Sequence, residues 1–350
     1  EIYTSLTSAA SDVYKRQIVA TGGTIAGTGK KGKTAAYHAG EIDIDSIIET
    51  IPEINEVAHI KEYQLMNIDS NEMTHEKWLI LKNNIEEILS DDTIDGAVVT
   101  HGTDTLDETA YFLTLTLNTP KPVVLTGAMR PATATSADGP FNLYQAICLA
   151  CHGESYNRRV LALFSNTIYS GRDIEKVNNF KIDAFDQRSL GCLGYMQDQE
   201  VYFYTQTSKI HTVKSRFNKR IDSIKSVAIA FYYSGADAKI LYDLASDHEG
   251  IVIAGSGSGN YSQAWLKAIE ELSEKGTIFV RSSRISQGIV FDDEIFDPHH
   301  LCISSNTLSP QKARVLLMLA LTQTHDRDEI REIFLPVSYT HLTLPTIRLV

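Results

Sequence analysis

The 350-residue sequence has little cysteine, no long hydrophobic run and a shortage of basic residues. Its four cysteines are too few for the dense disulfide framework of a small secreted scaffold. The longest unbroken apolar runs have only seven residues, as from Val315 to Leu321, whereas a membrane-spanning helix needs about 20. Lys and Arg number 32 against 44 Asp and Glu, and the resulting net charge of -12 repels phosphate backbones. The composition therefore predicts a soluble, acidic protein of two domains and disfavours sequence-independent binding of nucleic acid.

The two ends of the sequence differ from the rest. Residues 1–17 and 337–350 show no amphipathic period and no helix caps, and they resemble translated adapter or vector read-through. We therefore expect the folded domains to lie between residues 18 and 336. Because the natural start is in question, the missing signal peptide does not indicate a cytoplasmic protein.

Short apolar runs, each followed directly by small polar residues, recur along the body of the chain. They lie at 18–20, 97–99, 123–125, 160–164, 227–233, 251–254 and 278–280. Such runs predict strands buried on both faces. Apolar residues at helical spacing lie between them, and Ser309-Pro310 is typical of a helix start with a serine N-cap.

This alternation predicts an α/β fold with a mostly parallel sheet flanked by helices. The composition shift along the chain divides it into three parts. We expect a larger N-terminal catalytic domain at 18–204, a polar and basic linker at 205–226, and a smaller C-terminal α/β domain at 227–336.

One segment matches a phosphate-binding loop. Residues 27–34 (GTGKKGKT) fit G-x-x-x-x-G-K-[ST], with Lys33 for the phosphates and Thr34 for magnesium. Nucleotide binding is therefore an alternative function. However, the expected strand ends six residues before the motif and Gly40 interrupts the segment after it, so a flexible loop is the better interpretation.

Threonines at two strand ends are candidates for chemistry. Thr24 follows a Gly-Gly pair, which lets the backbone turn tightly, and Thr103 begins Thr-Asp-Thr after another strand. A threonine nucleophile needs a nearby base or cation, for which Lys176 and Tyr37 are candidates. Because threonine is also a common helix N-cap, the residues alone leave both interpretations open.

Several ordered segments resemble the signature segments of bacterial L-asparaginases. They are 20–27 (ATGGTIAG), 100–105 (THGTDT), 127–131 (GAMRP), 136–143 (SADGPFNL), 281–284 (RSSR) and 310–317 (PQKARVLL). The resemblance extends over residues 18–335, and 108–113 (ETAYFL) is similar to the type II branch, whose members are usually periplasmic. It implies the two-domain asparaginase-like fold and hydrolysis of L-asparagine to L-aspartate and ammonia.

The resemblance also implies roles for individual catalytic groups. It implies that Thr24 is the nucleophile that forms an acyl-enzyme and that Tyr37 contacts this hydroxyl and closes the site. Thr103, Asp104 and Lys176 would form a second set that activates the nucleophile or the hydrolytic water. No metal or cofactor is expected.

Substrate-binding groups are implied by the same resemblance. Ser70 is implied to bind the α-carboxylate and Asp104 the α-ammonium, while the backbone amides of Thr103 and Ala128 would stabilise the oxyanion. Asn71 stands beside Ser70 where the family more often has Gln or Glu, near the α-amino end of the substrate. Asparagine specificity and a broader glutaminase-asparaginase activity therefore both stay open.

The resemblance implies a homotetramer that is periplasmic or secreted, and a cytoplasmic location stays open as the alternative. Asn260 and Glu294 match residues that are donated to the site of a neighbouring subunit. An ammonia-transferring amidotransferase subunit is less favoured, because no basic patch for tRNA accompanies the site. Cys148 and Cys151 form a C-x-x-C that we interpret as buried helical thiols, and His101 as a structural loop histidine.

Overall fold

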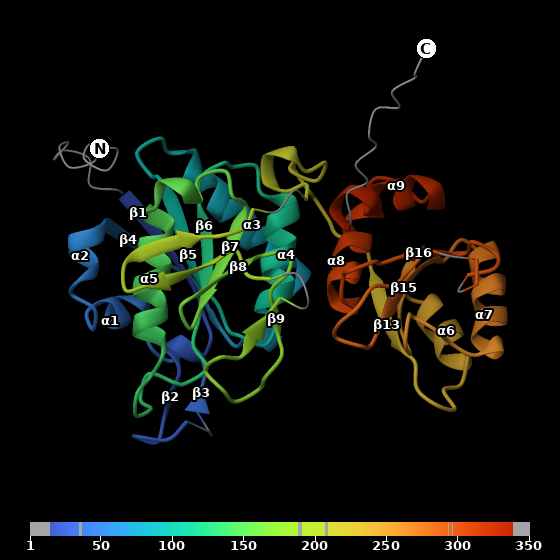
Figure 1. Ribbon diagram of the computed structural model, residues 1–350, viewed down its shortest axis with the longest axis horizontal. Helices are drawn as coiled ribbons and strands as arrows, with labels where there is room; N and C mark the ends of the chain where they lie inside the picture. Colours follow the sequence, from blue (N-terminus) through green and yellow to red (C-terminus); the bar gives the residue numbers. More distant parts are fainter. Residues whose placement is uncertain are drawn as a thin grey trace, which may run out of the picture. The chain divides into compact units, whose positions relative to one another are not determined.

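The computed structural model describes residues 15–34, 37–187, 191–206, 209–292, 294–295 and 297–338. They form two compact units (Figure 1). The first contains the chain up to residue 206 together with 212–220, and the second contains the remainder. Among the described residues, the helices are all too short or too polar to cross a membrane.

An eight-stranded sheet forms the centre of the first unit. Its strand order is β12-β11-β8-β7-β6-β5-β1-β4, and the five strands from β7 to β4 run parallel. The other three strands pair antiparallel, so the predicted mostly parallel sheet is confirmed and carries an antiparallel edge. The strands are β1 (Lys15–Gly22), β4 (His59–Ile68), β5 (Gly96–Thr100), β6 (Val123–Thr126), β7 (Val160–Phe164), β8 (Thr167–Ser170), β11 (Gly194–Gln197) and β12 (Glu200–Phe203).

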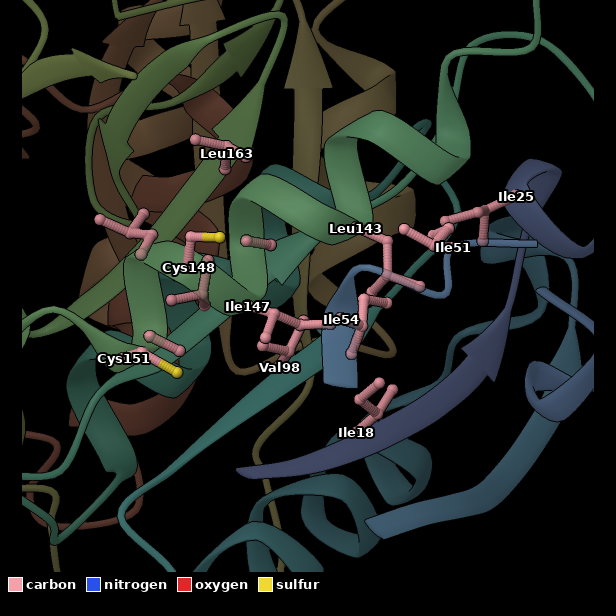
Figure 2. Packing of buried hydrophobic residues seen from close by; sticks show 14 of the residues in the cluster. Ile18, Ile25, Ile51, Ile54, Val98, Leu143, Ile147, Cys148, Cys151 and Leu163 are labelled. Carbon is pink, nitrogen blue, oxygen red and sulfur yellow. The ribbon is translucent and has the colours of Figure 1, made fainter. Parts of the chain in front are cut away.

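Helices cover both faces of this sheet. On one face lie α1 (Ile44–Ile48), α2 (Ile54–Val57) and α5 (Gly139–Cys151), and α3 (His75–Ser90) and α4 (Leu106–Thr116) contact the strands as a packed pair. Figure 2 shows Leu143, Ile147 and Cys148 of α5 packed in one apolar cluster with Ile18 and Val98 of the sheet. Each fully buried aliphatic side chain contributes about 1.5–3 kcal/mol, so this layer holds α5 firmly on the strands.

The second unit is a smaller parallel α/β layer. Strands β13 (Val227–Phe231), β14 (Gly250–Gly255), β15 (Ile278–Ser283) and β16 (Cys302–Ser304) lie in that order. Helices α6 (Lys239–Ala245) and α7 (Gln263–Glu274) bury apolar residues against the sheet, among them Trp265. Helix α8 (Pro310–Ala320) contacts three of the strands and α9 (Arg327–Ser338) contacts β16.

Three local features differ from the sequence-based expectations. Strand β1 begins at Lys15, three residues before the expected start, because the buried Arg16 donates from Nε to Ala150 O (3.0 Å) and pairs with Asp95. In the expected linker, residues 212–220 pack with the first unit, where Phe217 is buried. Helix α8 does begin at Pro310, but the Ser309 side chain makes no capping hydrogen bond to any described residue.

The segment that matches a phosphate-binding loop forms a hairpin. It includes β2 (Thr28–Gly29) and continues toward β3 (Tyr37–His38), with which β2 pairs antiparallel. Thr133 anchors this hairpin, since its hydroxyl accepts from Gly29 N (3.0 Å) and its carbonyl from Gly32 N (2.9 Å). A phosphate-binding loop needs a helix N-terminus directly after it. The hairpin therefore does not support the nucleotide-binding alternative.

Candidate active site

The candidate residues lie just beyond the carboxyl ends of four neighbouring parallel strands. Thr24 lies two residues after β1 and Ser70 two residues after β4. Thr103 lies three residues after β5 and Ala128 two residues after β6. Since β6, β5, β1 and β4 are adjacent in the sheet, these four loops share one edge, where open α/β sheets bind their ligands.

The loops at this edge touch one another through their backbones. Gly23 has φ +83°, and a Cβ added to it would lie 2.4 Å from the Gly102 nitrogen, so only glycine permits this approach. Gly23 N donates to Ile68 O (3.0 Å), which joins the β1 and β4 ends. Thr105 Oγ1 donates to the Ser70 carbonyl (2.8 Å). The loops after β1, β4 and β5 thus form one packed surface, in which Thr24 and Ser70 are buried.

A lysine from a distant part of the chain completes a charged cluster here. Lys176 lies in the short strand β9 (Glu175–Lys176), which pairs with β10 (Phe185–Asp186). Its Nζ donates to Thr103 Oγ1 (2.8 Å) and lies 2.5 Å from Asp104 Oδ1. The Lys176 side chain is 15% exposed and the Asp104 side chain 55%. The structure therefore brings together three residues that the family resemblance grouped.

The turn before β9 is held by buried charged groups. Ser170 Oγ accepts from Arg172 N (3.2 Å) and from Arg159 Nη1 (3.3 Å), and the Arg172 guanidinium pairs with the Asp173 carboxylate. Both arginines are buried, and burial lowers the pKa of Arg159 to about 10. These contacts fix the backbone just before Lys176.

His101 lies next to the cluster but is enclosed in the fold. Burial lowers its pKa to about 4, so the imidazole is neutral near pH 7. Nδ1 lies 2.7 Å from Gly102 O and Nε2 lies 3.0 Å from Thr109 Oγ1, which also accepts from Trp78 Nε1 (2.8 Å). The network assigns the ring proton to Nδ1. His101 thus braces the Thr103 loop, as expected of a structural histidine.

Asn71, an expected substrate-binding residue, follows Ser70 directly, and Tyr37, an expected catalytic residue, lies in the hairpin that follows Thr24. Asn71 is exposed, and its Nδ2 and its backbone N–H both donate to Asp69 Oδ1 (2.8 Å each). Tyr37 contributes its backbone to β3, but its side chain lies outside the described residues.

The other two expected residues belong to the second unit. Asn260 is exposed in the turn after β14, where its backbone N–H donates to Ser256 O (2.7 Å). The Glu294 side chain is 82% exposed and lies 3.6 Å from His300 Nε2.

The cysteine pair has the surroundings of ordinary core thiols. Cys148 and Cys151 are buried in α5, and burial raises the pKa of Cys148 to about 12. In the part of the chain that the structure describes, no group of three or more His, Cys, Asp or Glu side chains could hold a metal ion. The interpretation as buried helical thiols is confirmed.

Two supporting residues had no predicted role. Both lie at the start of α5 and bond to the backbone of the loop that carries Ala128. The Asp138 carboxylate accepts from Met129 N and Arg130 N, and the Asn142 amide donates to Gly127 O. Their segment was recognisable only as part of a signature, because hydrogen bonds to backbone groups leave no pattern in a single sequence.

Comparison with known proteins identifies the family. The family model described as "Asparaginase, N-terminal" matches residues 17–209, and "Glutaminase/Asparaginase C-terminal domain" matches residues 226–334. The chain belongs to the asparaginase family. It is 43% identical over 328 residues to "Probable L-asparaginase periplasmic" of Haemophilus influenzae, covering 93% of each chain.

Other members of the asparaginase family carry different names. "Glutaminase-asparaginase" of Pseudomonas fluorescens is 38% identical over 322 residues, covering 91% of this chain and 89% of its own. The crystal structure of "Probable Cytoplasmic L-asparaginase" from Campylobacter jejuni superposes with a TM-score of 0.88 at 43% identity, covering 92% of this chain and 99% of its own. The asparaginase-like fold is thereby confirmed. Of these relatives, one is named periplasmic and another cytoplasmic, and both are 43% identical to this chain.

Proposed function

We propose that this protein hydrolyses the side-chain amide of L-asparagine to L-aspartate and ammonia through an acyl-enzyme on Thr24. The observation that carries the proposal is the contact of Lys176 with Thr103 and Asp104, on the sheet edge that also presents Thr24. The family membership and the names of the relatives support the same substrate class.

The substrate is a zwitterion whose two charged ends need opposite partners. The half-exposed Asp104 carboxylate binds the α-ammonium, and Ser70, buried in the neighbouring loop, binds the α-carboxylate. Charge-assisted hydrogen bonds of this kind are short and about twice as strong as neutral ones. They hold the side-chain amide over the Thr24 loop.

In the first step Thr24 Oγ forms a bond to the amide carbon. The hydroxyl proton passes by way of the Thr103–Lys176 pair to the amide nitrogen, the carbon–nitrogen bond breaks, and ammonia leaves. The Lys176 ammonium donates to Thr103 Oγ1, which makes the Thr103 hydroxyl a better donor toward the leaving nitrogen.

In the second step water attacks the ester carbon. Its proton returns to Thr24 Oγ, and L-aspartate is released. Both steps pass through a tetrahedral oxyanion, which the backbone N–H groups of Thr103 and Ala128 stabilise. Tyr37, on the hairpin beside the site, closes over the nucleophile.

The complete site needs a second copy of the chain. We propose a homotetramer in which Asn260 and Glu294 reach the site of a neighbouring subunit, in line with the exposure of both side chains. We also propose a periplasmic or secreted location, which one relative's name supports.

A broader glutaminase-asparaginase activity is the second candidate, favoured by the relatives that carry that name. Asn71 stands near the α-amino end of the substrate, and its amide is held by Asp69. An extra methylene in a fitted pocket is worth only about 1–3 kcal/mol, so modest changes can shift the preference.

The test is ammonia release by the purified protein from L-asparagine and from L-glutamine, measured side by side as kcat/KM. We expect asparagine to be the better substrate and Thr24→Ala to abolish release from both. Equal kcat/KM values would favour the broader activity, and an active Thr24→Ala enzyme would overturn the mechanism.

A further inference from the structure

The peptide that presents the Ala128 amide is held by a buried carboxamide. Asn142, the fourth residue of α5, donates from Nδ2 to the Gly127 carbonyl (3.0 Å). Its Oδ1 accepts from Ser165 N (3.2 Å), so the amide cannot rotate without losing one of these bonds. Asn142 is buried, and these contacts join the loop after β6 to the loop after β7.

Holding the Gly127 carbonyl also sets the direction of the Ala128 N–H. The two groups belong to one planar peptide unit and, in the trans form, point in opposite directions. Because Asn142 draws the carbonyl toward α5, the Ala128 N–H is aimed away from that helix. A Cβ added at Gly127 would lie 2.3 Å from His101 O, so this peptide is pressed against the loop that carries Thr103.

The same glycine makes the restraint necessary. Gly127 permits the close approach to His101, but a glycine also lets the adjoining peptide rotate more freely than any other residue. A rotated peptide would present its carbonyl oxygen where the N–H is needed. The Asn142 hydrogen bond opposes this rotation.

Asp138, the residue before α5, holds the next two peptide units. Its carboxylate oxygens accept from Met129 N (2.9 Å) and Arg130 N (2.9 Å). Asn142 Nδ2 lies 3.3 Å from Asp138 Oδ2, which connects the two side chains. The backbone from Gly127 to Arg130 is therefore held from α5 at three consecutive peptide units.

We propose that Asn142, supported by Asp138, is a positioning residue that orients the Ala128 N–H toward the oxyanion. The inference rests on the proposed function, because an oxyanion arises only if the amide is attacked at this site. It predicts that loss of the carboxamide weakens binding of the tetrahedral state and leaves binding of the ground state intact.

The test compares Asn142→Leu with Gln145→Leu. Gln145 is a second buried carboxamide of α5, and it donates to a backbone carbonyl away from the site, Asp198 O (3.2 Å). Both variants lose a hydrogen bond to a backbone carbonyl. Asn142→Leu also loses the bond from Ser165 N and the contact with Asp138, so its kcat is compared at a urea concentration and temperature where both variants are fully folded. Four quantities are measured: kcat and KM for L-asparagine, the inhibition constant of L-aspartate, and the inhibition constant of L-aspartate β-semialdehyde. The aldehyde of the last compound can form a tetrahedral adduct with Thr24.

For Asn142→Leu we expect kcat to fall about 10- to 100-fold, less than or equal to the effect of removing an oxyanion donor outright. KM and the inhibition constant of L-aspartate should stay within about threefold of wild type, because the contacts that bind the ground state are unchanged. Inhibition by the semialdehyde should weaken in parallel with kcat. Gln145→Leu should keep the wild-type values. Asp138→Asn, which retains one acceptor oxygen, should show the same pattern with a smaller fall in kcat. This variant replaces Asn142→Leu in the test if Asn142→Leu does not fold.

Equal kcat values for the Asn142→Leu and Gln145→Leu enzymes would overturn the inference, as would a loss of L-aspartate binding in proportion to kcat. Both outcomes leave the proposed function standing, because wild type is active in them. A wild-type protein that releases no ammonia from either amide would overturn the proposed function and the inference with it.

Discussion

Replacing Lys176 with methionine removes the ammonium and keeps most of the length of the side chain. The change deletes the hydrogen bond to Thr103 Oγ1 (2.8 Å) and the ion pair with Asp104 (2.5 Å). The buried charges of the turn before Lys176 are untouched, so the strand that carries it should stay in place.

The structure predicts a small effect on stability and a large one on catalysis. The hydrogen bond to Thr103 contributes about 0.5–1.5 kcal/mol net. The ion pair adds about 0–1 kcal/mol, because the Asp104 side chain is 55% exposed and water screens it. The free energy of unfolding should therefore fall by about 0.5–2.5 kcal/mol. Loss of positioned proton transfer should lower kcat about 100- to 10,000-fold, or about 3–5 kcal/mol of transition-state stabilisation.

The assay measures ammonia release from L-asparagine and the urea midpoint of the same preparations. Lys121→Met is the matched control, because Lys121 is also half-buried and its Nζ makes two 2.9 Å hydrogen bonds, to Leu89 O and Asp91 O, outside the site. The control should lose comparable stability and keep its kcat. A Lys176→Met enzyme that retains more than about a tenth of the wild-type kcat would refute the role of this lysine, since a positioned proton-transfer group is worth at least about 100-fold.

Buried titratable groups give two further predictions. Because burial lowers the pKa of His101 from 6.5 to about 4, the unfolded chain binds a proton between these values and the folded chain does not. The contribution of His101 to the free energy of unfolding should therefore be constant above pH 6.5 and should fall by about 3 kcal/mol as the pH drops from 6.5 to 4. In a series of urea denaturations over this pH range, His101→Gln should reduce the slope of the free energy of unfolding against pH. An unchanged slope would contradict the assignment. Burial also raises the pKa of the Cys148 and Cys151 thiols, so a thiol-disulfide reagent at pH 8 should label them only after unfolding. Because Cys192 is partly exposed, peptide mapping locates the label, and rapid labelling of the Cys148–Cys151 peptide in the native protein would show that these thiols are accessible.

The buried parallel strands could be predicted because burial on both faces demands a continuous apolar run. Strand β4 was not predicted, because it is a half-buried edge strand whose exposed positions carry polar residues and interrupt the apolar run. Among these residues are His59, Lys61 and Glu62. Arg16 shows the same limit within β1, since a charged residue breaks the apolar pattern although its guanidinium is paired inside the fold.

The site was predictable where its residues lie in signature segments. Lys176 could be grouped with Thr103 and Asp104 only through the family resemblance, because no local pattern relates residues more than 70 positions apart. Asn142 and Asp138 lie within a signature segment, but their partners are backbone groups of another loop. Only three-dimensional geometry reveals contacts of that kind.

In the proposed mechanism Thr24 carries the acyl group during hydrolysis. Peptide mass mapping of the protein, quenched in acid at successive times while it turns over L-asparagine, tests this step directly. We predict an increase by the mass of one aspartyl group on the peptide that contains Thr24, and none in Thr24→Ala. An aspartyl adduct on any other residue, or an adduct that forms equally in Thr24→Ala, would contradict the mechanism.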